Sequence, residues 1–379
     1  MAAALIGGSL AFRALQAQMA RSAFLMAFRT ARSGDAASSQ HLPPGLADEL
    51  LAAQVLHKGA NSCIVRATRR SGGMSVAVKL VVAEQGRFDA PRARALRREA
   101  YMLVALTERK CEEAVRLSGL GSFQLLPRQG LAWFVLELEE GRDMATVMAA
   151  SRDGPVADTE CMRFARDVLN ALGLFHTSGL IHGDVRPANV LRVRSKGMFA
   201  YKLLDFARAV AVDPVMAPAA LVDNDARAHP RMAPGSLPYA APEMFECPER
   251  ASCSADVWSL GVSIFHIATH SLPFQADSDE LWPVAVAGDM EARAPCVLDR
   301  LDASQRSAFD NGLAKVVARC LEKNPQERFE RAEEVYEAVY ACLTTRGEEA
   351  YSVFISYRVA SDAPLARLLF DELNHSVTP

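Results

Sequence analysis

The sequence predicts an α+β fold in which a small β-rich part is followed by a larger α-rich part. From about Leu50 the chain shows short apolar runs separated by turn residues, and residues 131–138 form another apolar run, a pattern typical of strands. From Asp158 the apolar residues recur at helical spacing instead. One face of this helix would carry Met162, Ala165, Val168, Leu169, Leu172 and Phe175. Helical patterns then dominate to about Leu343.

The composition is that of an ordinary globular protein. The chain has 379 residues, of which 50% are hydrophobic and 23% charged, enough for two or three domains or one large one. The formal net charge of −3 argues against nucleic-acid binding, and no apolar run reaches the length of a transmembrane helix. The 8 cysteines include no C-x-x-C pair, which disfavours a zinc site or disulfide framework and favours a reducing, cytoplasmic compartment.

Residues 1–49 form a predicted N-terminal leader. Residues 1–34 contain four arginines and no acidic residue, with Ala, Ser, Leu and Phe between them. This composition resembles an organelle transit peptide, and the alternative is an N-terminal helix or a disordered leader. A stretch rich in Ser, Gly and Pro at 33–45 would separate the leader from a globular domain that begins at residue 50.

The most specific pattern lies at residues 182–189, which are His-Gly-Asp-Val-Arg-Pro-Ala-Asn. An apolar run precedes it, and a second apolar run further on leads into Asp205. Phosphoryl transfer needs these residue types, because one Asp accepts a hydroxyl proton, an Asn five residues later holds a metal ion, and a second Asp holds metal across the triphosphate. Asp184, Asn189 and Asp205 occupy those positions.

Two more motifs precede this pattern, and together they resemble the eukaryotic protein kinase family over about residues 50–345. Val-Ala-Val-Lys ends at Lys79 and is typical of the third strand of the family's small lobe. Twenty residues later, Arg-Arg-Glu ends at Glu99 and opens a helical run. The resemblance implies that Lys79 and Glu99 form an ion pair.

Three later segments match the family in order. Residues 235–243 resemble the end of an activation segment, 256–261 the start of the central helix, and 324–328 a late arginine motif. The resemblance implies a structural ion pair between Glu243 and Arg328. Independent motifs in family order make coincidence a poor explanation.

The resemblance also implies a bilobal protein kinase fold that uses ATP and Mg²⁺. Asp184 would be the catalytic base, Lys79 would hold the α- and β-phosphates, and Arg186 would contact the transferred phosphoryl group. Asn189 and Asp205 would hold Mg²⁺. The implied cofactor-binding residues are Gly59, Lys79, Glu99, Glu137, Glu139, Asn189 and Asp205, with the two glutamates offering backbone groups to adenine.

Several positions depart from the family pattern. The phosphate-covering loop would span residues 57–62, where only Gly59 of the usual glycines is present. Glycine lets backbone N–H groups approach phosphates, so this loop is expected to cover ATP less closely. Ala207 replaces the usual glycine after Phe206, and its methyl group restricts the backbone of the metal-binding turn. Arg186 replaces the lysine usual in Ser/Thr-directed members, which keeps the charge and changes its geometry.

Gly183 is a further departure, because most family members carry arginine beside the catalytic Asp. That arginine must be neutralised, often by a phosphate on the activation segment. Between Phe206 and Gly235 the sequence contains no Ser, Thr or Tyr, so the phosphate and its receptor are both absent. We therefore expect activity that does not depend on phosphorylation within this segment.

Residues 350–379 resemble the opening strand and first helix of a TIR domain. The resemblance rests on Phe-Ile-Ser-Tyr at 354–357, followed by Ser361 and Asp362 and a helical pattern. It implies the start of a flavodoxin-like parallel sheet and TIR–TIR partners. One strand and one helix cannot bury a core of their own, so we expect an incomplete domain.

These observations favour an ATP-dependent kinase that phosphorylates Ser or Thr hydroxyls of a protein substrate, in signalling. The first alternative is a pseudokinase that acts as a scaffold, favoured by His57, Ser62 and Ala207 and opposed by the intact charged residues. A small-molecule phosphotransferase is the second, because His-Gly-Asp also occurs in antibiotic-type kinases. The third is an adaptor whose TIR region directs assembly while the kinase part regulates it.

Overall fold

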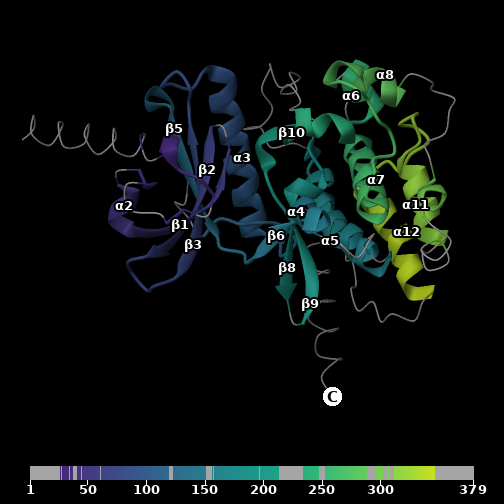
Figure 1. Ribbon diagram of the computed structural model, residues 1–379, viewed down its shortest axis with the longest axis horizontal. Helices are drawn as coiled ribbons and strands as arrows, with labels where there is room; N and C mark the ends of the chain where they lie inside the picture. The colour runs from purple at the N-terminus through teal and green to yellow at the C-terminus, as the bar shows by residue number, and fades with distance from the viewer. Residues whose placement is uncertain are drawn as a thin grey trace, which may run out of the picture. The chain divides into compact units, whose positions relative to one another are not determined.

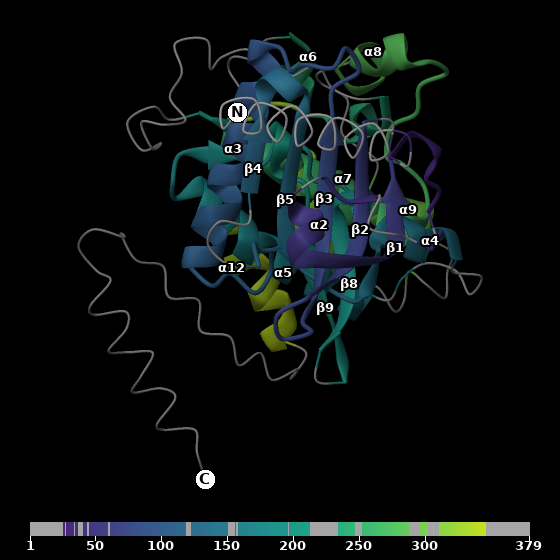
Figure 2. The ribbon, with the colours of Figure 1, turned by 90° about the vertical axis from the view of Figure 1, so that its left-hand side faces the viewer.

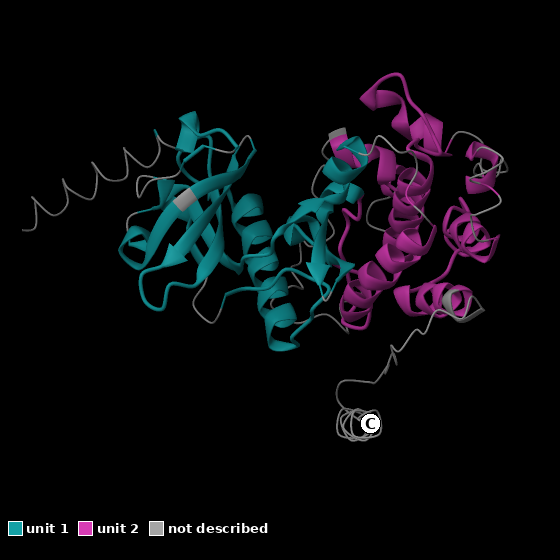
Figure 3. Cartoon of the chain, turned by 60° about the horizontal axis from the view of Figure 1, so that its bottom comes forward, with its two compact units in different colours: residues 1–150, 187–210 teal, residues 151–186, 211–379 magenta. Residues whose placement is uncertain are grey.

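A computed structural model of the chain shows two compact units (Figures 1 and 3). Unit 1 comprises Met1–Ala150 and Pro187–Val210, and unit 2 comprises Ser151–Arg186 and Ala211–Pro379. The structure describes residues 26, 28–33, 35–36, 41–43, 45–59, 61–118, 123–150, 156, 158–195, 197–212, 234–246, 252–287, 296–301, 306 and 311–345. The prediction of a β-rich part followed by a helical part is confirmed. Among the described residues, none of the helices has the length and hydrophobicity that a membrane span requires.

Unit 1 is built around an antiparallel five-stranded sheet with the strand order β1-β2-β3-β5-β4. A second sheet has the order β6-β8-β9. The elements are α2 (Leu46–Glu49), β1 (Leu50–Lys58), β2 (Ser62–Arg69), β3 (Ser75–Val82), α3 (Ala90–Glu108), β4 (Phe123–Leu126), η2 (Pro127–Gln129), β5 (Leu131–Glu137), β6 (Gly141–Asp143), α4 (Met144–Ala150), η3 (Pro187–Asn189), β8 (Val190–Ser195), β9 (Met198–Leu203) and η4 (Phe206–Arg208). The short strand β10 (Val210–Ala211) lies where the chain passes into unit 2.

The two faces of the large sheet carry different residues because side chains alternate along a strand. In β3, Val76, Val78 and Leu80 are buried in one hydrophobic cluster, while Lys79 points to the other face. In Figure 1, α2 and α3 lie on opposite sides of this sheet, and Figure 2 shows α2 in front of the strands.

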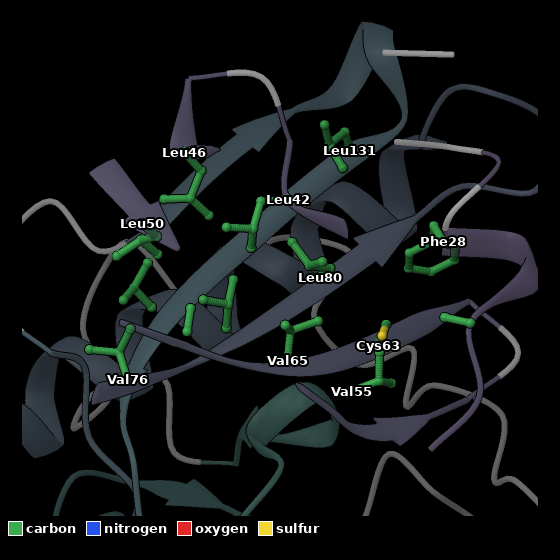
Figure 4. Packing of buried hydrophobic residues seen from close by; sticks show 14 residues of the cluster. Phe28, Leu42, Leu46, Leu50, Val55, Cys63, Val65, Val76, Leu80 and Leu131 are labelled. Atoms are coloured by element: carbon green, nitrogen blue, oxygen red, sulfur yellow. The ribbon is translucent and has the colours of Figure 1, made fainter. Parts of the chain in front are cut away.

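The hydrophobic cluster also takes in residues that precede β1. Phe28, Ala31, Leu42 and Leu46 are buried in it, beside residues of β1 and β2 (Figure 4). The start of the kinase domain at residue 50 stays a prediction, but the core of unit 1 includes these earlier side chains. The transit-peptide prediction falls mostly on residues 1–25, which lie outside the described residues.

Unit 2 is mainly helical. It contains α5 (Asp158–His176), β7 (Leu180–Ile181), η5 (Pro234–Tyr239), α6 (Pro242–Glu246), α7 (Cys253–Thr269), η7 (Asp279–Leu281), α8 (Trp282–Ala287), α9 (Val297–Arg300), α11 (Asn311–Cys320) and α12 (Ala332–Thr345). Almost every residue of α7 is buried, so this helix forms the centre of the unit. A Cβ atom on Gly261 would lie 2.7 Å from the Cβ of Cys320, so glycine permits the close approach of α7 and α11.

The apolar face predicted for α5 is confirmed, since all six of its residues are buried. The predicted TIR segment, 350–379, lies outside the described residues.

Candidate functional site

Lys79 is the centre of a charged cluster in unit 1. Its Nζ lies 2.5 Å from Oε1 of Glu99 and 2.9 Å from Oδ1 of Asp205. The side chain of Glu99 is 3% exposed and that of Asp205 is 44% exposed, so the cluster is closed on one side and open on the other. An ammonium group has three N–H donors, and the described residues supply acceptors for two.

Local sequence explains how the two partners reach Lys79. The side chain of Asp89 caps α3 by accepting a hydrogen bond from the N–H of Arg92, and a proline follows at the start of the helix. Glu99 lies on the buried face of α3, between Leu96 and Leu103. Burial alone would lower the pKa of Lys79, but the carboxylates of Asp205 and Glu99 outweigh this effect and raise the pKa. The lysine is therefore charged at physiological pH.

Asn189 and Asp205 flank the same end of a β-hairpin. Val190, which follows Asn189, pairs with Leu203 in the antiparallel ladder of β8 and β9. The N–H of Leu204 donates to the carbonyl of Asn189 over 2.8 Å. Amide and carboxylate oxygens are the donors that Mg²⁺ prefers, usually completed by substrate phosphates. These two residues therefore fit the predicted ion.

The turn after β9 shows how the backbone accommodates Ala207. Asp205 adopts a left-handed backbone conformation with φ +60°, which is uncommon for a non-glycine residue. Ala207 lies in η4 and is not among the described residues with positive φ. In this conformation the position does not require glycine.

The predicted phosphate-covering loop forms the hairpin between β1 and β2. Lys58 pairs with Cys63, and the N–H of Gly59 donates to the carbonyl of Ser62 over 2.9 Å. A Cβ on Gly59 would lie 2.9 Å from Oγ of Ser62, so a larger residue there would require the serine side chain to rotate.

The two predicted adenine-contacting residues are held by ion pairs. The carboxylate of Glu137 lies 2.9 Å from the guanidinium of Arg116, and Glu139 pairs with Lys202. The N–H of Glu137 donates to the carbonyl of Arg116. Of the two backbone groups of Glu137, only the carbonyl is therefore left for the predicted contact with adenine. Charge pairing, which the sequence did not indicate, fixes these residues.

Asp184 and Arg186 lie in unit 2 and contact each other. Nε of Arg186 is 3.4 Å from Oδ1 of Asp184, and Nη1 of Arg186 donates to the carbonyl of Gly235 over 3.2 Å. One guanidinium thus bridges the predicted base and the end of the predicted activation segment. Gly183 has φ +74°, a backbone conformation that favours glycine over the arginine usual at this position.

The backbone around Asp184 is fixed by Asp256 of α7. Its carboxylate accepts hydrogen bonds from the N–H groups of His182, over 2.7 Å, and Gly183, over 2.9 Å, and it contacts Nε2 of His176. Nδ1 of His176 accepts a hydrogen bond from the N–H of Ala332, so the imidazole is the tautomer that donates from Nε2. Burial alone would raise the pKa of Asp256, but the hydrogen bonds that its carboxylate accepts from His176 and from the N–H of Gly183 outweigh burial and lower the pKa.

The predicted pair between Glu243 and Arg328 is confirmed. Both ends of the guanidinium contact the carboxylate, over 2.7 and 2.8 Å. The Arg328 side chain is fully buried, and it also donates to the carbonyls of Ser254, Glu322 and Lys323.

Sequence reasoning missed a small pocket beside Asp184. It has room for about one water molecule and is lined by Gly183, Asp184, Val185, Ser236, Tyr239, Ala240, Met244, Ala255, Asp256 and Ser259. Oγ of Ser236 is buried there without a hydrogen-bond partner among the described residues. Burial raises the pKa of Tyr239 to about 12, and its hydroxyl contacts Nδ1 of His266 over 2.7 Å. The only sequence signal for Ser236 was its place in the segment 235–243.

Comparisons with known proteins indicate the family of this chain. The model of a family described as the protein kinase domain matches residues 52–341. The chain is 30% identical over 262 residues to the serine/threonine-protein kinase PksC of Streptomyces coelicolor, which covers 68% of this chain and 42% of that protein. It is 30% identical over 297 residues to the serine/threonine-protein kinase PknB of Mycolicibacterium smegmatis, and the match covers 77% of this chain and 43% of that protein.

A third relative, the PknB of Mycobacterium tuberculosis, is 27% identical over 297 residues, covering 77% of this chain and 42% of that protein. The chain thus spans less than half the length of these relatives. The matched region, 52–341, contains the Lys79 cluster, the Asp184 loop and the Arg328 pair. The chain therefore belongs to the protein kinase family.

Proposed function

We propose that this protein is an ATP-dependent kinase that phosphorylates Ser or Thr hydroxyls of protein substrates. The observation that carries the proposal is the Lys79 cluster, in which two carboxylates orient an ammonium group that keeps one N–H donor without an acceptor among the described residues. Asp205, the more exposed partner, offers oxygen atoms to a metal ion. The curated relatives named above are serine/threonine-protein kinases, which supports the same chemistry.

Each charged residue has a role in this mechanism. Lys79 binds and orients the α- and β-phosphates, and Glu99 fixes its ammonium group. Asn189 and Asp205 would hold Mg²⁺, which neutralises charge on the triphosphate when bound. Asp184 accepts the proton of the attacking hydroxyl at its carboxylate. The two sets of residues are joined covalently, since only four residues separate Asp184 from Asn189.

Arg186 is proposed to contact the transferred phosphoryl group. Its guanidinium lies beside the proposed base and carries a positive charge at any physiological pH. It would compensate negative charge on the phosphoryl oxygens. The carboxylate of Asp184 and the carbonyl of Gly235 hold this guanidinium before substrate arrives.

A pseudokinase is the second candidate, and the hairpin favours it. Only Gly59 remains of the usual glycines, and the N–H of Gly59 is already bonded to Ser62. Against this alternative, Lys79, Glu99 and Asp205 are all present and in contact. Charge neutralisation and positioning supply most of the catalysis of phosphoryl transfer, so we favour activity.

Phosphotransfer by the full chain tests the proposal. The protein is incubated with labelled ATP, Mg²⁺ and a generic basic protein, beside Lys79→Met and Asp205→Asn variants. We expect labelled phosphoserine or phosphothreonine with the wild type. With either variant, the rate should fall by at least about a hundredfold. Predominant phosphotyrosine would contradict the Ser/Thr assignment. ATP binding without any product would favour the pseudokinase.

A TIR function and organelle targeting remain separate proposals, because residues 350–379 and most of 1–34 lie outside the described part of the chain. We propose a cytoplasmic kinase whose C-terminal residues begin a TIR domain. Localisation of the tagged full chain in cells tests the first part. Association with a second tagged copy, lost on removal of 350–379, tests the TIR–TIR partner.

A further inference from the structure

We propose that the described residues of the segment 28–36, here called the N-terminal strap, hold the β1–β2 hairpin in place, with Lys58 as the positioning residue that joins strap and hairpin. The inference rests on the proposed function, because the hairpin is the predicted phosphate-covering loop. It assigns a nucleotide-positioning role to residues that precede the family match at residue 52.

The side chain of Lys58 binds the strap. Its Nζ donates a hydrogen bond to the carbonyl oxygen of Phe28 and lies 3.4 Å from the centre of the Phe28 ring. A cation over an aromatic face is attracted by the negative face of the ring. The positive charge at the start of the hairpin is therefore directed to Phe28, which suits a role in holding the loop.

The backbone of β1 is also tied to the strap. The N–H of Lys58 donates to Oγ of Ser33 over 3.1 Å, and the N–H of Val55 donates to the carbonyl of Asp35 over 2.9 Å. Ala36 forms an antiparallel bridge with Gln54. Since β1 is an edge strand of the sheet, the strap pairs an edge that has no other strand beside it among the described residues.

Apolar packing anchors the strap itself. Phe28 is 4% exposed and lies in the same cluster as Val55 and Cys63, the residues that flank the hairpin on its buried face (Figure 4). The side chain of Asp35 accepts a hydrogen bond from the N–H of Arg32 over 2.6 Å, which closes a turn within the strap. The strap is thus a folded part of unit 1.

Holding the hairpin before ATP arrives favours binding. A loop that is already ordered loses less conformational entropy when it closes on a ligand. Asn61, near the tip, adds a second restraint through a 2.8 Å hydrogen bond to Glu84. The hairpin has only one of the glycines usual in the family, and it gains order from residues outside the family match.

Two measurements on the full chain test this inference with Lys58→Met and Phe28→Leu variants. Phe28→Leu keeps the carbonyl acceptor and most of the apolar volume but removes the ring. Amide hydrogen exchange of residues 54–63 is measured without nucleotide, and we expect exchange about tenfold faster in both variants, because opening the hairpin needs less free energy. ATP and adenosine binding are then measured by calorimetry in Mg²⁺.

We expect the Kd for ATP to rise about fivefold and the Kd for adenosine to stay the same, because the hairpin covers phosphates and not the nucleoside. Lys58→Arg, which keeps a cation for the Phe28 ring, should recover much of the ATP affinity. Arg128→Met removes an exposed cation between β4 and β5, at the other edge of the sheet, and should change neither quantity.

Unchanged hydrogen exchange in both Lys58→Met and Phe28→Leu would contradict the inference that the strap holds the hairpin in place. An equal loss of ATP and adenosine affinity would overturn the positioning role and indicate general destabilisation. If the wild type bound no ATP, the proposed function and the positioning role would both fail. Hydrogen exchange would still decide, in that case, whether the strap holds the hairpin.

Discussion

Each unit builds a charged cluster around one cation, Lys79 in unit 1 and Arg328 in unit 2, and the two clusters differ in what remains available. Arg328 is fully buried, and all five of its N–H donors have protein acceptors. In the described part of the chain, Lys79 finds acceptors for two of its three donors, and its partner Asp205 is 44% exposed. Among the described residues, the Arg328 cluster is thus saturated, whereas the Lys79 cluster keeps a donor and a partly exposed carboxylate, and it is the cluster that the proposed function assigns to phosphate binding.

The largest effect is expected from Arg328→Met. Removing the guanidinium leaves Glu243 without its partner and three backbone carbonyls without donors, which should cost about 3–5 kcal/mol of the free energy of unfolding. Urea denaturation followed by circular dichroism measures this cost. Arg331→Met, which breaks an exposed pair with Glu330, is the matched control and should cost less than about 1 kcal/mol. Equal losses in the two variants would contradict the comparison.

In contrast to Arg328→Met, Lys79→Met should reduce activity strongly and stability less. Its loss removes charge stabilisation of the transition state, with a penalty of about 3 kcal/mol, or about a hundredfold or more in kcat. Lys79→Met leaves the buried carboxylate of Glu99 without its partner, but it leaves no backbone carbonyl without a donor, and Asp205 stays partly solvated. The unfolding free energy should therefore fall less than in Arg328→Met, which also strands three carbonyls. Arg66→Met, which breaks a more exposed ion pair in the same unit, should leave kcat unchanged. A large loss of stability with normal kcat would make Lys79 a scaffold residue.

The contribution of Asp256 to the stability of unit 2 should depend on pH. The pKa of Asp256 is lowered in the folded chain, so its ionised form stabilises the fold above the unfolded pKa of about 4, and this stabilisation is lost as the pH falls through the folded pKa. Asp256→Asn should cost about 2 kcal/mol at pH 7, where charged hydrogen bonds are lost, and less at pH 3. Urea denaturation at both pH values checks this, and a cost that grew with acidity would contradict it.

The resemblance to the protein kinase family predicted contacts that the family motifs share. Lys79 with Glu99 and Glu243 with Arg328 are examples, since each motif specifies both residue types and their local elements. The strap was not predictable, because its residues have a leader-like composition and meet the hairpin about 30 positions later in the chain. Long-range contacts without a periodic pattern carry no local signal.

Ser236 shows a different limit. A serine in a turn-rich segment gives no sign of burial, yet Ser236 is 4% exposed and lies in η5, an element that packs against α7. The ion pairs of Glu137 and Glu139 were hidden for a similar reason, since their partners lie on other elements. Residue type sets what a side chain can do, and the fold decides which groups it meets.

A substitution of Arg186 should have a smaller effect on activity than one of Lys79. The guanidinium of Arg186 has two protein contacts, whereas that of Arg328 has acceptors for all its donors. The Arg186 guanidinium bridges Asp184 and the carbonyl of Gly235, and the compact ammonium group of lysine would bridge them poorly. Arg186→Lys should lower kcat about tenfold, equivalent to about 1.4 kcal/mol, with unfolding free energy little changed. Steady-state kinetics at saturating ATP measures the loss, and an unchanged kcat would show that charge alone is needed.

The smallest effect should come from removing phosphate. Gly183 takes the place of the arginine that would receive a phosphate, the sequence between Phe206 and Gly235 holds no hydroxyl side chain, and Ser236 is buried. Treating the purified full chain with a broad phosphatase should therefore leave the initial rate unchanged. The bridge from Arg186 to Gly235 holds the end of this segment without a phosphate. A large loss of rate, restored by phosphorylation of Ser236, would contradict this inference, because it would require the buried hydroxyl to open and be modified.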